Sequence, residues 1–182
     1  MHEWIDTLKL DRHIEGGYFG LVYQSVDHVT SFNERYQDTL TQERAVYERK
    51  ASSSIYFLLE KHDFSAWHQL KSDEIWHYYD GGSAIDIHTI DQHGLYEVKS
   101  LGHPRLFDNA SFQVIITAGT WFAAELQNKS SYGLVGCTVS PGFEYQDFTL
   151  AIGAELVTQY PEHAAIINRL TRCHDTLRES HG

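Results

Sequence analysis

Short runs of residues rich in Tyr, Phe, Ile, Val and Thr follow one another from Tyr18 to Ala151, and turn sequences separate many of them. These residue types suit a pleated, half-buried surface. Asp-Gly-Gly at 80–82, Ala-Gly at 118–119 and Pro-Gly at 141–142 are typical turn sequences. Closely spaced short strands with no helix between them predict an antiparallel sandwich or barrel. The expected strands are residues 18–27, 44–50, 53–60, 64–70, 74–79, 84–90, 95–101, 112–117, 121–127, 131–139 and 146–151.

Both ends of the chain differ from this strand-rich middle. Apolar residues at helical spacing predict a short helix within residues 2–10 and another within 161–171, where Pro161 suits a first helical turn. We expect a single domain over residues 1–172 and a polar tail over 173–182, because 182 residues are too few for two ordinary domains.

Composition excludes several classes of function. The net charge of −11 argues against nucleic acid and anionic membranes as partners, since neither polyanion would be attracted. Hydrophobic residues make up 42% of the chain, which is enough for a packed core. Cys137 and Cys173 are the only cysteines, and the sequence has no apolar window of about 18 residues. Residues 1–13 have no basic region followed by an apolar run, so we expect no signal peptide. We therefore expect a cytoplasmic protein.

The segment 30–50 is dense in charge and allows two interpretations. We favour a solvated hairpin or edge strand guarded by its charges over a lid or partner surface. Its charged residues are Glu34, Arg35, Asp38, Glu43, Arg44, Glu48, Arg49 and Lys50.

The stretch 64–82, FSAWHQLKSDEIWHYYDGG, holds the polar residues best placed for chemistry. If strand 64–70 turns into strand 74–79, His68 and Glu74 converge on one cavity. Alternation along the second strand places Glu74, Trp76 and Tyr78 on one face and the intervening residues on the other. The sequence alone leaves open which face points inward.

The spacing in this stretch resembles the first motif of the cupins, G-x5-H-x-H-x3/4-E-x6-G. His68, Glu74 and Gly81 match it, whereas Leu70 replaces the second histidine. The second cupin motif fits weakly, and Phe122 replaces its histidine. In metal-binding cupins these four positions hold the ion. Leu and Phe have no lone pair to donate, so we expect no metal and no other cofactor.

A closer resemblance covers nearly the whole chain, and it is to the largely uncharacterised cupin-5 family. Five segments carry it in order: HIEGGYF at 13–19, SIYFLL at 54–59, SDEIWHY at 72–78, AGTW at 118–121 and GCTVSPGF at 136–143. The resemblance implies a double-stranded β-helix, the cupin jelly roll, with short flanking helices. It also implies a homodimer in which an N-terminal strand extends the partner's sheet. The family is similar to the nucleotide-sugar epimerase cupins, but the resemblance assigns it no reaction.

These resemblances lead to an expected function and site. We expect a small polar metabolite, with sugars among the candidates, to bind in the barrel and undergo metal-independent proton transfer of the epimerase or isomerase type. By resemblance to epimerase cupins, His68 is the expected base, Glu74 orients it and Tyr18 is the opposing acid. The expected substrate-binding residues are Trp76, Tyr78, Tyr56, Trp121, Gln113 and Glu15.

Alternatives remain at each of these positions. His68 is equally well explained as a hydrogen-bonded histidine without chemistry, and aromatic residues on strands are more often core than pocket. The competing function is a non-catalytic small-molecule binding or sensor module in the same pocket. A metal-dependent dioxygenase is less favoured because of the missing ligands.

Overall fold

The computed structural model describes residues 3–31 and 47–172. The expected polar tail and residues 32–46 of the charged segment lie outside the described residues. The helices are α1 (Glu3–Leu8), α2 (Gly153–Gln159) and α3 (Ala164–Arg169), with 3-10 turns η2 (Tyr145–Asp147) and η3 (Pro161–His163). The strands are β1 (Asp11–Arg12), β2 (Tyr18–Gln24), β3 (His28–Ser31), β4 (Tyr47–Lys50), β5 (Ser53–Glu60), β6 (Phe64–Leu70), β7 (Asp73–Gly81), β8 (Ile85–Ile90), β9 (Tyr96–Leu101), β10 (Ala110–Ser111), β11 (Gln113–Ile116), β12 (Trp121–Leu126), β13 (Tyr132–Ser140) and β14 (Phe148–Leu150).

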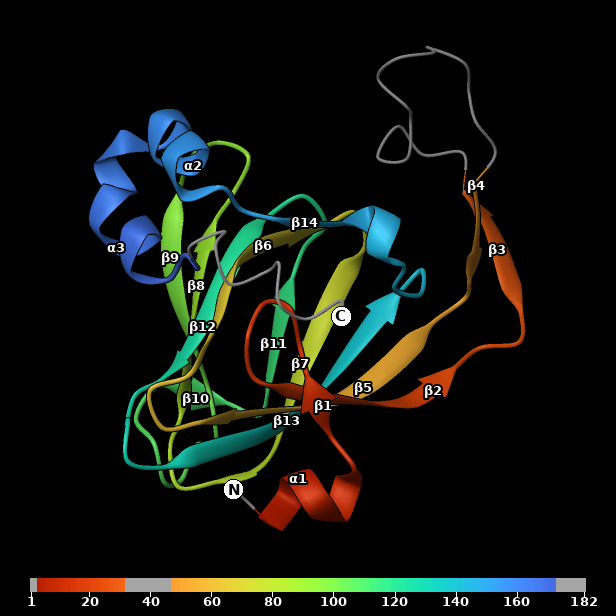
Figure 1. Cartoon of the computed structure of the whole chain (residues 1–182), viewed down its shortest axis with the longest axis horizontal. Helices are drawn as coiled ribbons and strands as arrows, with labels where there is room; N and C mark the ends of the chain where they lie inside the picture. The colour runs from red at the N-terminus through yellow and green to blue at the C-terminus, as the bar shows by residue number, and fades with distance from the viewer. Residues whose placement is uncertain (1–2, 32–46, 173–182) are drawn as a thin grey trace, which may run out of the picture.

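Two six-stranded sheets form the walls of a barrel (Figure 1). The first has the order β1-β2-β5-β13-β7-β11, and the second has the order β10-β9-β8-β12-β6-β14. All pairings within them are antiparallel except β9 with β10. Neighbours such as β5 and β13 are distant in sequence, which is the connectivity of a jelly roll. The expected all-β class is therefore confirmed.

The main core lies between the two sheets, where apolar side chains from both inner faces meet. Phe57 of β5, Trp76 of β7 and Phe122 of β12 belong to it and are almost completely buried. Alternation along β7 places Glu74 and Trp76 inside, and Ile75 is less buried. The structure thus settles which face of this strand points inward.

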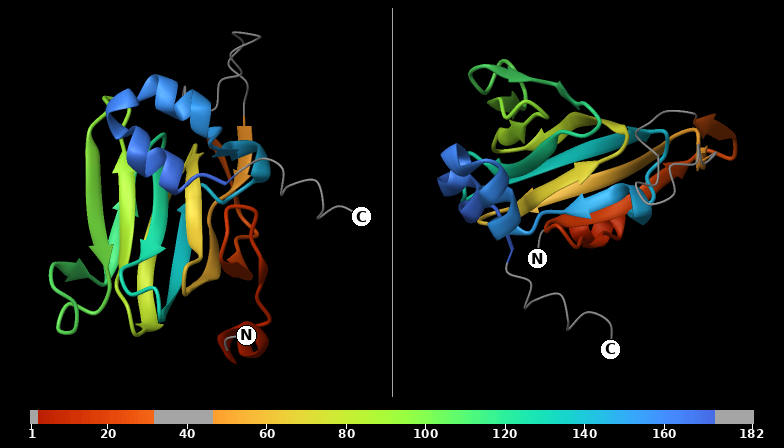
Figure 2. Two further views of the ribbon diagram at one scale, coloured as in Figure 1. Left: turned by 60° about the vertical axis from the view of Figure 1, so that its left-hand side comes forward. Right: turned by 90° about the horizontal axis from the view of Figure 1, so that it is seen from above.

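Each sheet also has a covered outer face. Helices α2 and α3 pack on the second sheet over Trp67 and Ile90, and Ile167 of α3 is buried in the same cluster (Figure 2). Helix α1 packs on the first sheet over Leu58 and Leu134. These layers explain the apolar residues that strands β5 and β6 carry on both faces.

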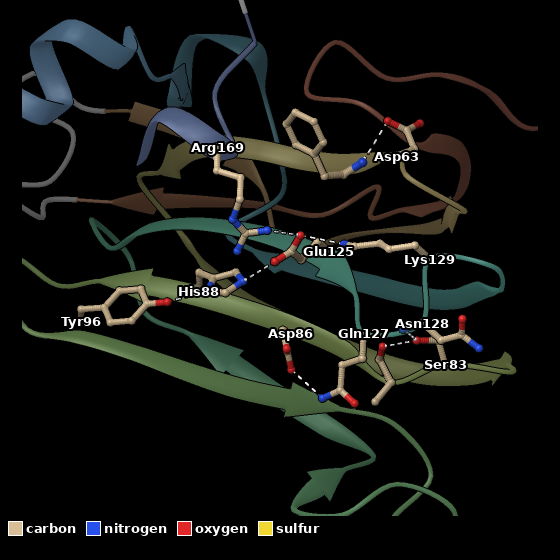
Figure 3. Close-up of polar contacts among 12 residues, drawn as sticks. Asp63, Ser83, Asp86, His88, Tyr96, Glu125, Gln127, Asn128, Lys129 and Arg169 are labelled. Carbon is tan, nitrogen blue, oxygen red and sulfur yellow. Dashed lines mark hydrogen bonds and ion pairs between the residues drawn. The ribbon is translucent and has the colours of Figure 1, made fainter. Parts of the chain in front are cut away.

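A polar network fixes α3 to the second sheet, as Figure 3 shows. The carboxylate of Glu125 on β12 accepts hydrogen bonds from Arg169 of α3 at 2.6 Å and from Lys129 at 2.7 Å. His88 of β8 lies 3.2 Å from the same carboxylate and 2.7 Å from the Tyr96 hydroxyl. Every member has a partner, so this network is explained by its structural role.

The sequence-based element boundaries differ from the structure mainly at the C-terminal end. The helix expected within 161–171 is the 3-10 turn η3 followed by α3, and α2 was not predicted. Strands β1, β3 and β10 have only two to four residues, too few for a periodic pattern. Strands β3 and β4 pair as a separate two-stranded sheet beside the barrel (Figure 1).

Candidate functional site

A cavity of about 310 Å³ lies within the barrel, with a wall of mostly aromatic and aliphatic side chains. Phe57, Trp76 and Phe148 are examples of this wall. Leu21 and Tyr145 also line it and are more than half exposed, so they mark its mouth. The rest of the lining includes apolar and uncharged polar residues. Its histidine, glutamate and cysteine residues are His13, Glu15, His68, Glu74, Cys137 and Glu144.

A tight turn before β2 places Glu15 in the cavity. Gly16 has a φ of 113°, a conformation that residues with a Cβ rarely adopt. A Cβ on Gly16 would also lie 2.1 Å from the carbonyl oxygen of Phe64, so this position needs glycine. The Glu15 carbonyl accepts a hydrogen bond from the Ala66 amide at 2.8 Å, which fixes the turn to β6. The Glu15 side chain is therefore held inside, and the residue is only 5% exposed.

The Glu15 carboxylate has three side-chain partners. Ser65 donates a hydrogen bond to Oε1 at 2.9 Å. The other oxygen, Oε2, lies 3.2 Å from His68 Nε2 and 3.4 Å from His13 Nδ1. Burial alone would raise the pKa of Glu15, but the charges of both histidines and the hydrogen bonds of His13 and Ser65 lower it. Glu15 is thus an ionised group in an otherwise apolar site.

The His68 ring and the Glu15 carboxylate are placed to hold one proton between them, because Nε2 of His68 lies 3.2 Å from Oε2 of Glu15. Its Nδ1 lies 2.7 Å from the carbonyl oxygen of Ala66, which only accepts hydrogen bonds, so Nδ1 carries a hydrogen. The contact between Nε2 and Glu15 is then attractive only when a second proton lies between them. Burial lowers the pKa of His68, and the charge of Glu15 offsets part of that effect. Glu15, and not Glu74 as the sequence predicted, is therefore the partner of His68.

Glu74 is the most unusual group in the cavity. It is 6% exposed, and its Oε2 has no hydrogen-bond partner among the described residues. Burial and the negative charge of Glu15 raise the pKa of Glu74 to about 8, although Trp76 and Cys137 partly oppose the rise. The indole Nε1 of Trp76 is likewise buried without a partner in the described structure. Two polar groups thus lack partners in a cavity large enough for a ligand.

The residues at the cupin metal positions do meet at this cavity, but they do not suit a metal ion. His68, Leu70 and Glu74 line it, and the Phe122 ring lies 3.9 Å from the His68 ring between centroids. Leu70 and Phe122 supply no ligand atom. Among the described residues, no group of three or more His, Cys, Asp or Glu side chains is arranged to hold a metal.

The structure brings together only some of the predicted site residues. His68, Glu74, Trp76 and Glu15 line the cavity, and the other five do not. Tyr18 and Tyr56 pack on the outer face of the first sheet, in the apolar cluster beneath α1. Trp121 packs on the outer face of the second sheet, in the apolar cluster beneath α2 and α3. Tyr78 packs against the main core, while Gln113 is exposed on β11. Tyr18 is thus not placed to act as the acid opposite His68.

Sequence reasoning did not select His13 as a site residue. It lines the cavity between Glu15 and the ring of Phe19, whose centroid is 4.9 Å from that of His13. The available signal was the position of His13 at the start of the turn that carries Glu15, because the Gly16 amide donates a hydrogen bond to the His13 carbonyl at 3.1 Å and closes that turn.

The comparisons with known proteins agree with this architecture. A family model described as Cupin superfamily (DUF985), Cupin_5, matches residues 2–151. The chain belongs to this family. No curated protein matches this cupin. None of its described helices has the length and apolar character needed to cross a membrane.

Solved structures similar to this cupin include two of nearly the same length. A hypothetical protein from Leishmania major is 30% identical with a TM-score of 0.80, and covers 94% of this chain and 98% of its own. A protein from Shewanella oneidensis is also 30% identical, with a TM-score of 0.76 and coverage of 93% and 96%. Oxalate decarboxylase from Bacillus subtilis is 11% identical with a TM-score of 0.50, and covers 87% of this chain and 36% of its own, which shows a shared fold alone.

Proposed function

We propose that this cupin binds a small carbonyl compound in the barrel and catalyses metal-independent proton transfer of the isomerase or epimerase type. The observation that carries the proposal is the buried, unpartnered carboxyl of Glu74 in the same cavity as the Glu15–His68 pair. Glu74 is an acid without a partner, and the Glu15–His68 pair is a base that can take up a proton between Oε2 and Nε2. Such a combination is what proton transfer next to a carbonyl requires.

The proposed reaction begins with the Glu15–His68 pair acting as the base. The pair removes a proton from the carbon next to the carbonyl and holds it between Glu15 Oε2 and His68 Nε2. The electrons of the broken C–H bond form a carbon–carbon double bond. The carbonyl π electrons move to its oxygen, which takes a proton from Glu74 to give an enol. The pair then returns its proton to the same carbon, where it exchanges with solvent, or to the neighbouring carbonyl carbon, and Glu74 recovers a proton from oxygen, so atoms and charge balance.

The protonation states of the two carboxyls support these roles. Glu74, with a pKa of about 8, holds its proton at neutral pH and donates it as a neutral acid. Glu15 has a lowered pKa and is ionised, and Ser65 and His13 hold its carboxylate in place. Two carboxyls in one cavity with pKa values pushed apart are a typical acid and base assignment. Glu15 and His68 interact through their charges, so we describe the base as the Glu15–His68 pair and not as either residue alone.

We expect purified protein to exchange the carbon-bound hydrogens beside the carbonyl of a small ketone for deuterium in D2O. Proton NMR measures this exchange for each member of a panel of ketones and aldehydes without knowledge of the natural product. Glu15→Gln keeps the size of the side chain but removes its charge, so the exchange rate should fall by about 100-fold or more. His68→Ala should have a similar effect, since both residues form one base.

The matched control for this experiment is Glu97→Gln, which removes an exposed carboxylate on β9 outside the cavity. Its exchange rate should remain that of the unmodified protein. Thermal unfolding of each variant separates loss of the base from loss of the fold. Equal rates in the Glu15→Gln variant and the unmodified protein would refute the proposed base.

The second candidate function is a non-catalytic binding or sensor module. The observation that favours it is the mostly apolar cavity wall, which suits binding whether or not a reaction follows. This function predicts no exchange for any compound, together with an affinity that falls on Trp76→Ala and is unchanged on Glu97→Gln.

We also propose that the chain forms a homodimer through the outer edge of β2. Only Tyr18 and Phe19 of β2 pair with β1, so residues 20–24 have no strand on that edge among the described residues. Val22 is 52% exposed and Val26, just beyond the strand, is 84% exposed. An unpaired edge with exposed apolar side chains is a natural site for strand pairing between chains.

We expect light scattering coupled to gel filtration to give the mass of a dimer for the unmodified chain. Val22→Lys combined with Val26→Lys should give a monomer, since paired copies would place added charges at the interface. Leu95→Lys and Val98→Lys, which change exposed apolar residues of the β8–β9 hairpin, provide the matched control and should remain dimeric. A monomeric unmodified chain at micromolar concentration would contradict the proposal.

A further inference from the structure

The hydrogen-bonding groups left without partners in the cavity define what a ligand must supply. Trp76 Nε1 is a donor only, and Glu74 in its protonated form is also a donor. The two residues are alternate positions on the inner face of β7, so their side chains point to the same side. A ligand oxygen that accepts hydrogen bonds would satisfy both.

The charge distribution argues against a negatively charged ligand. No Lys or Arg among the described residues lines the cavity, whereas Glu15, Glu74 and Glu144 do. Arg49 lies 3.7 Å from Glu144 of the cavity lining, but its guanidinium already binds the Asp147 carboxylate at 2.6 and 3.0 Å. A carboxylate or phosphate would therefore lose its hydration and gain no described cationic side chain.

The same residues disfavour a positively charged ligand. The Glu15 carboxylate already faces His13, His68 and Ser65, and the Glu144 carboxylate lies 3.7 Å from the Arg49 guanidinium. Glu74 would have to lose its proton to offer a negative charge. That loss is unfavourable below about pH 8, because the pKa of Glu74 is about 8.

The size and lining of the cavity limit the body of the ligand. Its volume of about 310 Å³ is at the lower end of ligand pockets, which span roughly 300–1,000 Å³. Phe57, Phe143 and Phe148 belong to the wall, and such side chains favour a compact apolar or aromatic body. A nucleotide-linked substrate is therefore disfavoured by both its charge and its size.

We infer that the cavity selects an uncharged carbonyl compound with a compact apolar body, and that it discriminates against carboxylates, phosphates and organic cations. The carbonyl oxygen accepts hydrogen bonds from the Trp76 indole and the Glu74 carboxyl, and the body contacts the aromatic wall. This inference rests on the proposed function in that Glu74 receives the carbonyl, and it adds the charge and polarity of the substrate.

The test uses three flat molecules of nearly the same shape and different charge: benzamide, benzoate and benzamidinium. Binding to the full chain at pH 7 is followed through the indole N–H signal of Trp76 in nitrogen-15 NMR spectra. Trp76→Phe identifies that signal among the 4 tryptophans. We expect benzamide to shift it with an affinity at least about tenfold higher than that of either charged molecule.

A pH series and one variant separate this recognition from general affinity for an apolar pocket. Above about pH 8 Glu74 loses its proton, so benzamide should bind more weakly while the unbound protein stays folded. Glu74→Gln keeps an N–H donor that does not titrate, so benzamide binding should persist and lose this pH dependence. Non-specific binding would give the same pH profile in the unmodified protein and the variant.

The outcomes distinguish the inference from the proposed function. Tighter binding of benzoate or benzamidinium, or no shift of the Trp76 signal by any of the three at millimolar concentration, overturns the inferred ligand class. Preferred binding of benzamide without deuterium exchange in any ketone or aldehyde supports the ligand class and refutes the proposed reaction. The first result concerns charge selection, and the second concerns catalysis.

Discussion

Glu74→Gln is expected to stabilise the protein relative to the unmodified chain as the pH rises from about 4.5 to about 8. In the folded state the pKa of Glu74 is about 8, compared with 4.5 for an ordinary glutamate. Between these values the unfolded chain releases the proton and the folded protein keeps it, so the stability of the unmodified protein falls as pH rises. Each pH unit contributes about 1.4 kcal/mol, so the total reaches about 5 kcal/mol.

The glutamine variant does not titrate at this position and is free of that penalty. Urea unfolding at several pH values measures the difference in free energy between the two proteins. Its change across the pH series is the relevant quantity, because any fixed cost of the buried amide cancels. Glu97→Gln, an exposed change on β9, should stay within about 0.5 kcal/mol of the unmodified protein. A difference for Glu74→Gln that is constant with pH would show that Glu74 titrates normally.

The barrel itself was predictable because its signals are local. Period-two patterns and turn residues give strands β5 to β9 and β11 to β13 nearly at their observed positions. The C-terminal region was harder, since α2 and α3 have seven and six residues and are stabilised by packing on Trp67 and Ile90. Short helices of this kind depend on tertiary contacts that no local pattern records.

The site was only half predictable for a related reason. Spacing along β6 and β7 identifies His68 and Glu74, and both do line the cavity. The partner of His68 lies in a turn 53 positions earlier in the chain, at Glu15, and reaches it because Gly16 and Gly17 bend the backbone toward β6. Tyr18 and Tyr56 were expected in the cavity but lie outside it, because the alternation along β2 and β5 turns both side chains toward the outer face of the sheet.

The buried ion pair of Arg49 and Asp147 gives the second large effect on stability. Both residues are at most 5% exposed, and the guanidinium binds both carboxylate oxygens at 2.6 and 3.0 Å. Removing one partner leaves the other as a buried charge without its counter-ion. We therefore expect Arg49→Leu to lower the free energy of unfolding by about 3–5 kcal/mol, measured by urea unfolding at pH 7.

The double variant Arg49→Leu with Asp147→Leu decides whether the stranded charge causes this loss. Since neither residue then carries a charge, the double variant should be more stable than Arg49→Leu alone and recover most of the lost free energy. Asp147 belongs to η2, the turn that also carries Tyr145 at the mouth of the cavity. Arg49→Leu should therefore weaken benzamide binding as well, and the double variant should restore it. If the double variant instead loses as much unfolding free energy as Arg49→Leu and Asp147→Leu lose together, the two charges are not coupled. The loss would then be due to packing at β4 and η2.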